Sequence, residues 1–345
     1  MVAGGGRRLR IVVTDPIIER FATHLLDGAP EHDWNFLTDP HDPRLPEAIA
    51  GCDVLVCSRL SGEAAADCGA ELVQVTGAGL DRIAVDALPA GTLLANTFHH
   101  ARPIAEHVMM SVLALERRLL PTDAALRRGQ WSNLANDAAV PPHRSFDSLT
   151  VGSIGLGGIG TETLRLASAW GADTVAIRSD PTAALPGGIA PRWVRGPGAL
   201  PRLLEESDVV VVTVPLSDAT RGMIGARELA AMRPDALLVN VSRGPVVDQH
   251  ALFDALREPP TSGQGIGGAA LDVWWGAPEP RRTPPADVDF TTLQNVILTP
   301  HNSGHATATF VGRAADIAAN IEAISHGTTP INLVRRHSRS PIVST

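Results

Sequence analysis

The apolar residues of this chain gather in short, nearly continuous runs, and longer amphipathic segments separate these runs. Runs with few polar interruptions are typical of strands that are buried on both faces of a parallel sheet. We therefore predict strands at 9–15, 53–57, 72–76, 151–154, 174–177, 209–214, 237–240, 268–272 and 296–299.

Helical segments follow most of these runs, and their alternation with the strands predicts the fold class. We expect helices at 17–26, 104–120, 161–170 and 307–325. Pro103 stands at the start of the second helix, where the first turn tolerates proline. Strands that alternate with helices predict an α/β protein with doubly wound parallel sheets.

A chain of 345 residues exceeds the usual size of one hydrophobic core, so we predict two domains. The helix after Pro103 is expected to lead into the second domain, and the final helix to return the chain to the first. This predicts a discontinuous domain of residues 1–102 plus 305–345 around a domain of residues 103–304. The segment 181–201, rich in proline, glycine and alanine, is expected to be a surface connection.

Composition and charge exclude several functions. The formal net charge of −8 argues against nucleic acid as a partner, and no apolar run reaches the roughly 18–20 residues of a membrane span. The N-terminus has no apolar signal core, so we expect a cytoplasmic protein. Cys52, Cys57 and Cys68 lack metal-finger spacing and predict reduced thiols, with no metal site. The chain contains no lysine and no tyrosine, which excludes a lysine Schiff base and a tyrosine general acid.

Residues 151–160 form a strand followed by Gly-x-Gly-x-x-Gly and a helix. In this order Gly155 permits a tight turn, Gly157 lets the backbone approach a pyrophosphate, and Gly160 allows the helix to pack closely on the strand. The unpaired N–H groups of the helix N-terminus can bind phosphate. The next strand follows one helix later, as a dinucleotide-binding unit requires, so we predict such a site at Gly155, Gly157, Gly158, Ile159 and Gly160.

The end of that next strand bears on which dinucleotide binds. NAD enzymes usually carry an acid about 20 residues after the glycines, where it accepts hydrogen bonds from the ribose hydroxyls. Here the strand ends in Arg178 and Ser179, which suit a 2′-phosphate. We therefore expect NADP(H), and NAD(H) stays as the alternative because Asp180 follows directly.

Reactive side chains follow three late strands, where doubly wound sheets bind their ligands. Arg243 can grip a carboxylate with its planar fork of donors. His301 can donate a proton near neutral pH. Glu279 would pair with His301 and favour its protonated form. Together they predict a site that reduces a 2-oxo acid.

The chain resembles the D-isomer-specific 2-hydroxyacid dehydrogenases in several separated motifs. The resemblance rests on segments 76–81, 104–107, 151–160, 214–216 with Thr220, 240–248, 271–275 and 298–304. It implies a Rossmann-type cofactor domain inserted into a flavodoxin-like substrate domain, interconversion of 2-oxo and D-2-hydroxy acids, and a homodimer with the 104–120 helix near its interface.

The resemblance also implies further binding residues. Asp272 and Ser303 would hold the nicotinamide carboxamide, and Val241, Ser242 and Arg243 would border the nicotinamide. The adenosine and phosphate side would be lined by Val214, Pro215 and Thr220. Backbone N–H groups of Ala78 and Gly79 would bind the substrate carboxylate, alongside Arg243 and His301.

The interval before Glu279 is longer than the family pattern, which leaves the position of its carboxylate open. Three alternatives for the function also stay open. Oxidation of formate is disfavoured because that branch uses glutamine where this chain has Glu279. Oxidation of phosphite is disfavoured because it requires a lysine. A dinucleotide-sensing binding protein of the corepressor type is disfavoured because Arg243, Glu279 and His301 are all present.

Overall fold

The computed structural model describes residues 6–258, 265–276 and 285–334. The chain divides into two compact units, one of residues 1–99 and 306–345 and one of residues 100–305. We call them the first and the second unit. Within the described ranges, no helix combines the length and apolar character that crossing a bilayer requires.

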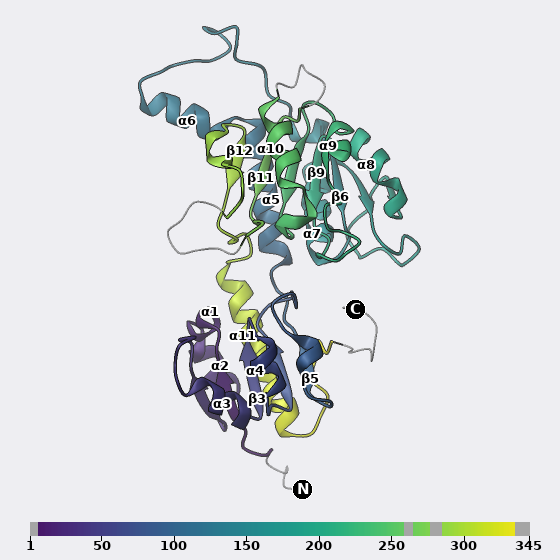
Figure 1. Cartoon of the computed structure of the whole chain (residues 1–345). Coiled ribbons are helices and arrows are strands. Elements are labelled where there is room, and N and C mark those ends of the chain that lie inside the picture. Colours follow the sequence, from purple (N-terminus) through teal and green to yellow (C-terminus); the bar gives the residue numbers. More distant parts are fainter. Residues whose placement is uncertain (1–5, 259–264, 277–284, 335–345) are drawn as a thin grey trace. The chain divides into compact units, whose positions relative to one another are not determined.

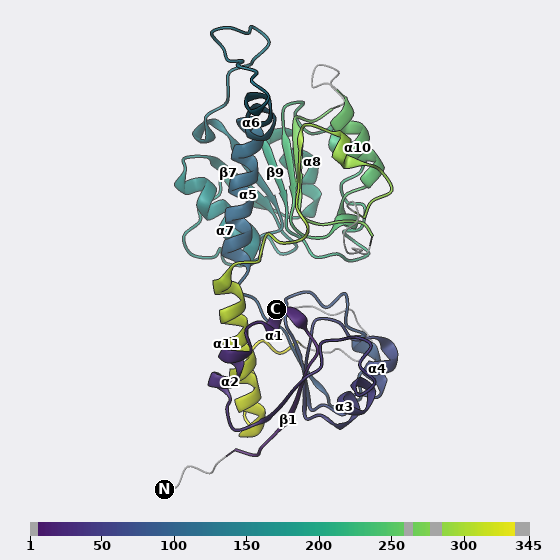
Figure 2. The same cartoon turned by 90° about the vertical axis from the view of Figure 1, so that its left-hand side faces the viewer.

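The first unit is a five-stranded parallel sheet in the order β2-β1-β3-β4-β5, which is the flavodoxin-like order. Helices α2 and α11 cover one face, and α3 and α4 cover the other (Figure 2). Its strands are β1 (Arg10–Val13), β2 (Asp33–Phe36), β3 (Val54–Cys57), β4 (Leu72–Val75) and β5 (Leu93–Ala95). Its α-helices are α1 (Pro16–Glu19), α2 (Ala22–Gly28), α3 (Leu45–Gly51), α4 (Gly62–Ala66) and α11 (Thr307–Ser325).

The second unit is a seven-stranded parallel sheet in the order β12-β11-β10-β9-β6-β7-β8, in which the strand order reverses beside β6 as in Rossmann folds. Helices α5 and α7 cover one face, and α8, α9 and α10 cover the other (Figures 1 and 2). Its strands are β6 (Thr150–Ile154), β7 (Asp173–Ile177), β8 (Trp193–Arg195), β9 (Val209–Val212), β10 (Leu237–Asn240), β11 (Gly268–Leu271) and β12 (Val296–Leu298). Its α-helices in the described residues are α5 (Ala101–Glu116), α6 (Leu119–Arg127), α7 (Gly158–Ala169), α8 (Leu200–Glu206), α9 (Ala226–Ala230) and α10 (Gln249–Arg257). The predicted α/β class with two doubly wound parallel sheets is confirmed.

Most of the apolar runs became strands whose residues are buried, which explains why they could be located from sequence. All four residues of β3, β4, β9, β10 and β11 are buried, as strands covered by helices on both faces must be. The three cysteines are free thiols that lie buried in the first unit.

Two predicted helices are interrupted. The segment 17–26 forms α1 and α2 with a break at Arg20 and Phe21, and the ring of Phe21 stacks on Phe310 of α11 at 5.1 Å. The segment 104–120 is divided because Arg118 adopts a left-handed backbone conformation with φ of 49°, so α5 ends at Glu116 and α6 begins at Leu119. Tertiary packing at Phe21 and the backbone turn at Arg118 therefore divide helices that the local periodicity predicts to be continuous.

The prediction that 181–201 is only a surface connection was wrong. The segment contains the edge strand β8, the 3₁₀ turn Pro197–Ala199 and the start of α8. Strand β8 has the sequence Trp-Val-Arg and is only partly buried, so it lacks the continuous apolar run by which the central strands were recognised. The preceding connection from β7 to β8, residues 178–192, contains no helix.

Arg144 joins three elements of the second unit through a partly buried ion network. Its guanidinium contacts Glu116 at the end of α5, and Nη1 lies 3.0 Å from carboxylate oxygens of both Asp208 and Asp235. Asp208 precedes β9 and Asp235 precedes β10. The Glu116 and Asp208 side chains are only 8% and 12% exposed, so without Arg144 the Glu116 carboxylate would lose its cation and Asp208 would keep only Arg233.

We expect Arg144→Leu to destabilise the second unit by about 3 kcal/mol, because it leaves the poorly hydrated Glu116 carboxylate without its cation. Scanning calorimetry should show a midpoint lower by about 6 °C. The matched control is Arg127→Leu, because Arg127 pairs with Asp123 on an exposed helix face. The control should change stability by less than about 0.5 kcal/mol, and equal shifts for both variants would contradict the role of Arg144.

Candidate active site

The three strands that precede the predicted catalytic residues lie next to one another in register. Asn240 of β10 pairs with Leu271 of β11, and Leu271 pairs with Leu298 of β12. The ladder continues past the strand ends, since Asp272 N donates to the Asn240 carbonyl at 3.1 Å and Thr299 N to the Leu271 carbonyl at 3.0 Å. The segments that carry Arg243, Asp272 and His301 therefore leave the same edge of one sheet.

Arg243 lies in a turn that its neighbours hold closely. The Asn240 side-chain amide donates to the Arg243 carbonyl at 3.1 Å, and Arg243 Nη1 donates to the Ser242 carbonyl at 2.8 Å. Ser242 N and Oγ both donate to Asn240 Oδ1 at 3.1 Å. A Cβ atom on Gly244 would lie 2.3 Å from the Trp274 carbonyl, so only glycine permits this contact between the two strand-end turns.

His301 occupies an exposed turn after β12 and adopts a left-handed backbone conformation, with φ of 57°. Such a conformation is uncommon for residues other than glycine and is found preferentially at functional sites. The neighbouring Asn302 and Ser303 donate backbone hydrogen bonds to Asp272, which is 1% exposed. Val241, Ser242 and Ser303 are also buried.

The two tryptophans after Asp272 hold neighbouring segments together. Trp274 Nε1 donates to the Thr299 carbonyl at 3.0 Å, which connects the β11 and β12 turns. Trp275 Nε1 donates to the Val247 carbonyl at 2.7 Å, and its ring stacks on Phe290 at 5.4 Å. These contacts give both side chains a structural role that the sequence did not reveal. Glu279 lies outside the described residues.

The glycine turn after β6 has the geometry that a dinucleotide needs. Gly155 has φ of 102°, and a Cβ atom on Gly160 would lie 2.3 Å from the Gly155 carbonyl. Open space surrounds the Cβ position of Gly157, the N-cap of α7. Gly158, Ile159 and Gly160 form the first turn of α7, whose N–H groups have no intrahelical acceptors and can bind an anion. The turn therefore fits a bound pyrophosphate.

At the end of β7 the two candidate ribose ligands are held in different ways. The Arg178 guanidinium donates to the carbonyls of Ala183 and Ala184, and its Nε is buried without a hydrogen-bond partner among the described residues. Asp180 Oδ1 accepts hydrogen bonds from Thr182 N at 3.0 Å and Thr182 Oγ1 at 2.6 Å. These bonds from Thr182 are the main cause of the lowered pKa of Asp180. Ser179 is exposed beside them.

The turn after β9 is held by one hydroxyl. Thr220 Oγ1 donates to the Pro215 carbonyl at 2.6 Å and accepts from Ser217 N at 2.8 Å. Val214 and Pro215 begin this turn beside the glycine turn, since a Cβ atom on Gly155 would lie 3.0 Å from a Val214 methyl group.

Ala78 and Gly79 belong to the first unit and follow β4. The Asn96 side-chain amide donates to the Ala78 carbonyl at 3.0 Å, and Thr97 N donates to the Gly77 carbonyl at 3.3 Å. The loop is thus fixed by the segment after β5, and Gly79 is exposed.

Two histidines near the unit boundary have structural surroundings. His99, with φ of 64°, places Nε2 2.9 Å from Asp316 Oδ2, and its ring occupies the space above Gly312. His107 lies on α5, where burial lowers its pKa and the charge of Asp272 partly opposes that shift.

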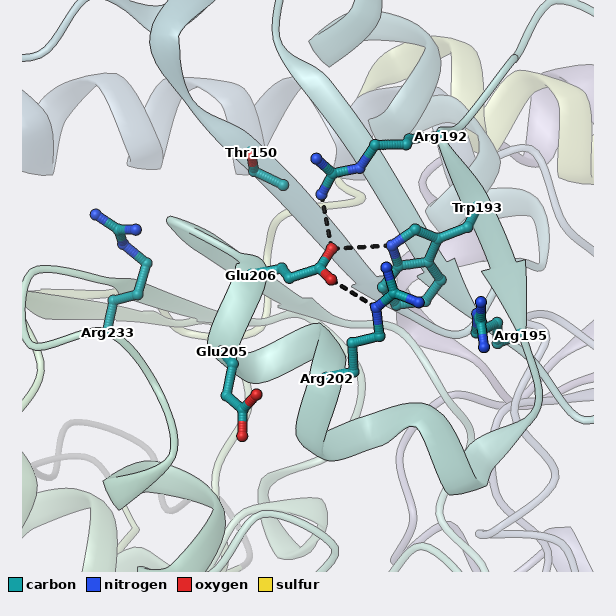
Figure 3. Close-up of a pocket in the computed structure, with 8 residues that line it drawn as sticks. All are labelled: Thr150, Arg192, Trp193, Arg195, Arg202, Glu205, Glu206 and Arg233. Atoms are coloured by element: carbon teal, nitrogen blue, oxygen red, sulfur yellow. Dashed lines mark hydrogen bonds and ion pairs between the residues drawn. The ribbon is translucent and has the colours of Figure 1, made fainter.

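A pocket at the outer edge of the second unit shares no residue with the predicted site. Figure 3 shows Arg192, Arg202 and the Trp193 ring nitrogen converging on the carboxylate of Glu206, at 2.7, 2.5 and 3.0 Å. These bonds account for the lowered pKa of Glu206, with Arg202 contributing most.

The described residues contain no cluster of three or more side chains suited to a metal ion.

Comparisons with known proteins agree with this architecture. The family described as "D-isomer specific 2-hydroxyacid dehydrogenase, NAD binding domain" matches residues 109–303. A glyoxylate reductase of Korarchaeum cryptofilum is 30% identical over 334 residues, which cover 95% of this chain and 96% of that protein. A glycerate dehydrogenase of Methylorubrum extorquens is 31% identical over 268 residues, which cover 76% and 78% of the two chains.

A solved structure gives the same result. A D-isomer-specific 2-hydroxyacid dehydrogenase from Xanthobacter autotrophicus, in complex with NADPH and MES, is 28% identical, with a TM-score of 0.75 over 96% of this chain and 98% of that one. The fold, the family match and the relatives agree, so this chain belongs to the D-isomer-specific 2-hydroxyacid dehydrogenase family and is an NAD(P)-dependent oxidoreductase.

Proposed function

We propose that this enzyme reduces a small 2-oxo acid to the corresponding D-2-hydroxy acid with NADPH. The observation that carries the proposal is the register of β10, β11 and β12, which starts the Arg243, Asp272 and His301 segments at one sheet edge. The relatives named glyoxylate reductase and glycerate dehydrogenase support a small substrate. A panel of 2-oxo acids that begins with glyoxylate and hydroxypyruvate tests it, and NADPH consumption with none of them would contradict it.

In the proposed reaction the carbonyl carbon gains a hydride and its oxygen gains a proton. The dinucleotide supplies the hydride when it is bound. Arg243 binds the substrate carboxylate and polarises the carbonyl, which orients the carbon for attack. His301 donates the proton to the developing alkoxide, and Glu279 would favour the protonated imidazole. Ala78 and Gly79 would donate backbone hydrogen bonds to the substrate carboxylate.

The proposed dinucleotide site follows the carboxyl edge of the second sheet. The pyrophosphate would bind at the glycine turn, which the open space at Gly157 and the close approach of Gly160 support. The nicotinamide would lie beside the turns after β10, β11 and β12, and the adenosine beside those after β7 and β9. The proposed contacts are Gly155, Gly157, Gly158, Ile159, Gly160, Arg178, Ser179, Val214, Pro215, Thr220, Val241, Ser242, Arg243, His301 and Ser303. Asp272, the remaining contact that the family resemblance implies, already accepts four hydrogen bonds from the turn that carries His301.

We expect at least about a tenfold preference for NADPH over NADH in kcat/KM. Arg178 would bind the 2′-phosphate by exchanging the carbonyls of Ala183 and Ala184 for phosphate oxygens, whereas Asp180 accepts hydrogen bonds from Thr182. Arg178→Met should lower kcat/KM for NADPH by about 10²-fold and leave NADH little changed, because charge-assisted bonds contribute about 1.5–3 kcal/mol each.

Arg165→Met is the matched control, because Arg165 donates to the Gly187 carbonyl in the same connection but lies on α7. Its NADPH preference should stay within about threefold of the wild type, well below the effect of losing a charge-assisted bond. A tenfold preference of the wild-type enzyme for NADH would refute the assignment. The relative from Xanthobacter with bound NADPH supports it.

We also propose that the enzyme is a homodimer through the α5–α6 region. Helix α6 buries none of its residues, and exposed apolar side chains gather on it and next to it. They are Met110, Leu119, Leu120, Leu126, Trp131 and Leu134, of which Trp131 is 72% exposed. A cluster of large exposed apolar side chains is typical of a surface that another protein covers. Figure 1 shows α6 and the loop beyond it extending from the second unit.

Leu119→Arg combined with Leu126→Arg should convert the dimer to a monomer, because two charges on one face of α6 would be buried unpaired. Light scattering after size exclusion measures the mass. Leu185→Arg, at a similarly exposed leucine of the β7–β8 connection, should leave the dimer intact. A monomeric wild type would contradict the proposal.

The three free thiols support a reducing, cytoplasmic location.

A further inference from the structure

The buried carboxylate of Asp272 accepts four hydrogen bonds from the segment that carries His301. Oδ1 accepts from Thr299 Oγ1 at 2.6 Å and from Asn302 N at 2.9 Å. Oδ2 accepts from Ser303 N at 3.0 Å and from the Ser303 hydroxyl. A carboxylate offers about four lone-pair sites, so these donors occupy all of them.

These donors lie on both sides of His301 in the sequence. Thr299 precedes it by two residues, and Asn302 and Ser303 follow it. Between them His301 adopts φ of 57°, a left-handed conformation that is uncommon for residues other than glycine. Asp272 is fixed in turn, because its own N–H continues the ladder from β11 to β10. The carboxylate therefore connects the sheet to the turn that carries His301.

His107 on α5 lies close enough to Asp272 to feel its charge, and burial, which is the larger effect, lowers the pKa of the His107 imidazole. The four hydrogen bonds to the Asp272 carboxylate come from the turn that carries His301. Charge-assisted bonds of this kind are the stronger ones in proteins.

We propose that Asp272 is a positioning residue, whose carboxylate holds the 299–303 turn so that the His301 imidazole faces the reacting carbonyl. The proposal rests on the proposed function of His301. It differs from a direct contact with the nicotinamide carboxamide, because a carboxamide N–H can reach Asp272 only by displacing one of the four donors. The two roles predict different results, since positioning affects turnover and a carboxamide contact affects dinucleotide affinity.

Asp272→Asn tests the proposal, because it keeps the size of the side chain but turns an NH₂ group toward donors of the turn. Hydrogen–deuterium exchange of the peptide that covers 299–305 should become at least about tenfold faster, because two backbone N–H groups lose a charged acceptor. kcat with the best 2-oxo acid should fall about 10- to 100-fold. The Kd for NADPH, from tryptophan fluorescence titration, should change by less than about threefold.

Asp289→Asn is the matched control, because Asp289 Oδ1 also accepts from a backbone N–H and a hydroxyl, both of Thr291, in the turn Phe290–Thr292. It should change exchange near its own turn and leave kcat at the wild-type value. Thr299→Val serves if Asp272→Asn does not fold, since it removes one donor and keeps the carboxylate. Its effects should have the same direction and be smaller.

Unchanged exchange in 299–305, or an NADPH Kd that rises in parallel with the loss of kcat, would overturn the positioning role. A wild-type enzyme that reduces no 2-oxo acid would refute the proposed function by itself. In that case, faster exchange and unchanged NADPH binding in Asp272→Asn would still support the inference that the Asp272 carboxylate holds the 299–303 turn. The two failures are therefore distinguishable.

Discussion

Replacing His301 by asparagine is expected to lower kcat for 2-oxo acid reduction by about 10³-fold, while the Kd for NADPH changes by less than about threefold. The imidazole is the proposed proton donor, and asparagine has no proton to give at neutral pH. Asparagine tolerates positive φ better than most residues, so the turn at φ of 57° should persist. Steady-state kinetics and a fluorescence titration with NADPH measure the two quantities.

His99→Asn is the control for this experiment. His99 is also a histidine at positive φ, but its ring pairs with Asp316 in the first unit. Its replacement should keep kcat within about threefold, the range expected when no proton donor is lost. An unchanged kcat in His301→Asn would remove His301 from the mechanism, and loss of NADPH binding with the fold intact would assign it to the cofactor instead.

Replacing Arg243 by glutamine is expected to lower kcat/KM by about 10³-fold, with most of the loss in binding of the 2-oxo acid. Two charge-assisted hydrogen bonds to a carboxylate are worth about 3–6 kcal/mol together, which corresponds to about 10²- to 10⁴-fold. Arg243→Lys should recover only part of this loss, because an ammonium group cannot form the planar two-bond fork. Initial rates over a range of 2-oxo acid concentrations separate kcat from KM.

Arg233→Gln is the control, because Arg233 precedes β10 whereas Arg243 follows it. Arg233 pairs with Asp208 and Asp235 at the opposite edge of the sheet. Its replacement should keep kcat/KM within about threefold, because Arg233 lies at the other edge of the sheet and Arg144 still pairs with both carboxylates. A similar loss for both arginines would indicate a general effect of charge and would contradict the assignment of Arg243.

The central strands and the last helix were predictable because burial on both faces leaves a clear pattern. Strand β10 matches its apolar run at 237–240, and α11 has the predicted bounds of 307–325. The edge strand β2, with alternating exposure, and the charged edge strand β8 have no such run. The break before Phe21 depends on its stacking against Phe310, nearly three hundred residues later, which local sequence does not encode.

For the site, sequence located the strand ends but not the contacts that shape them. The motifs indicated which turns carry Arg243 and His301, because parallel strands end at one edge. Three features became visible only in three dimensions. They are the four hydrogen bonds that Asp272 accepts, the positive φ of His301 and the hydrogen bond from Thr182 to Asp180. Each depends on backbone geometry that residue types alone leave undetermined.

The absence of a helix between β7 and β8 suggests a route to changing the coenzyme. Residues 178–192 form an exposed connection, so their replacement would not unravel a helix or remove a large part of the core. Grafting a short segment with an acid at the end of β7 into this position is therefore a practical design for an NADH-using version of the enzyme.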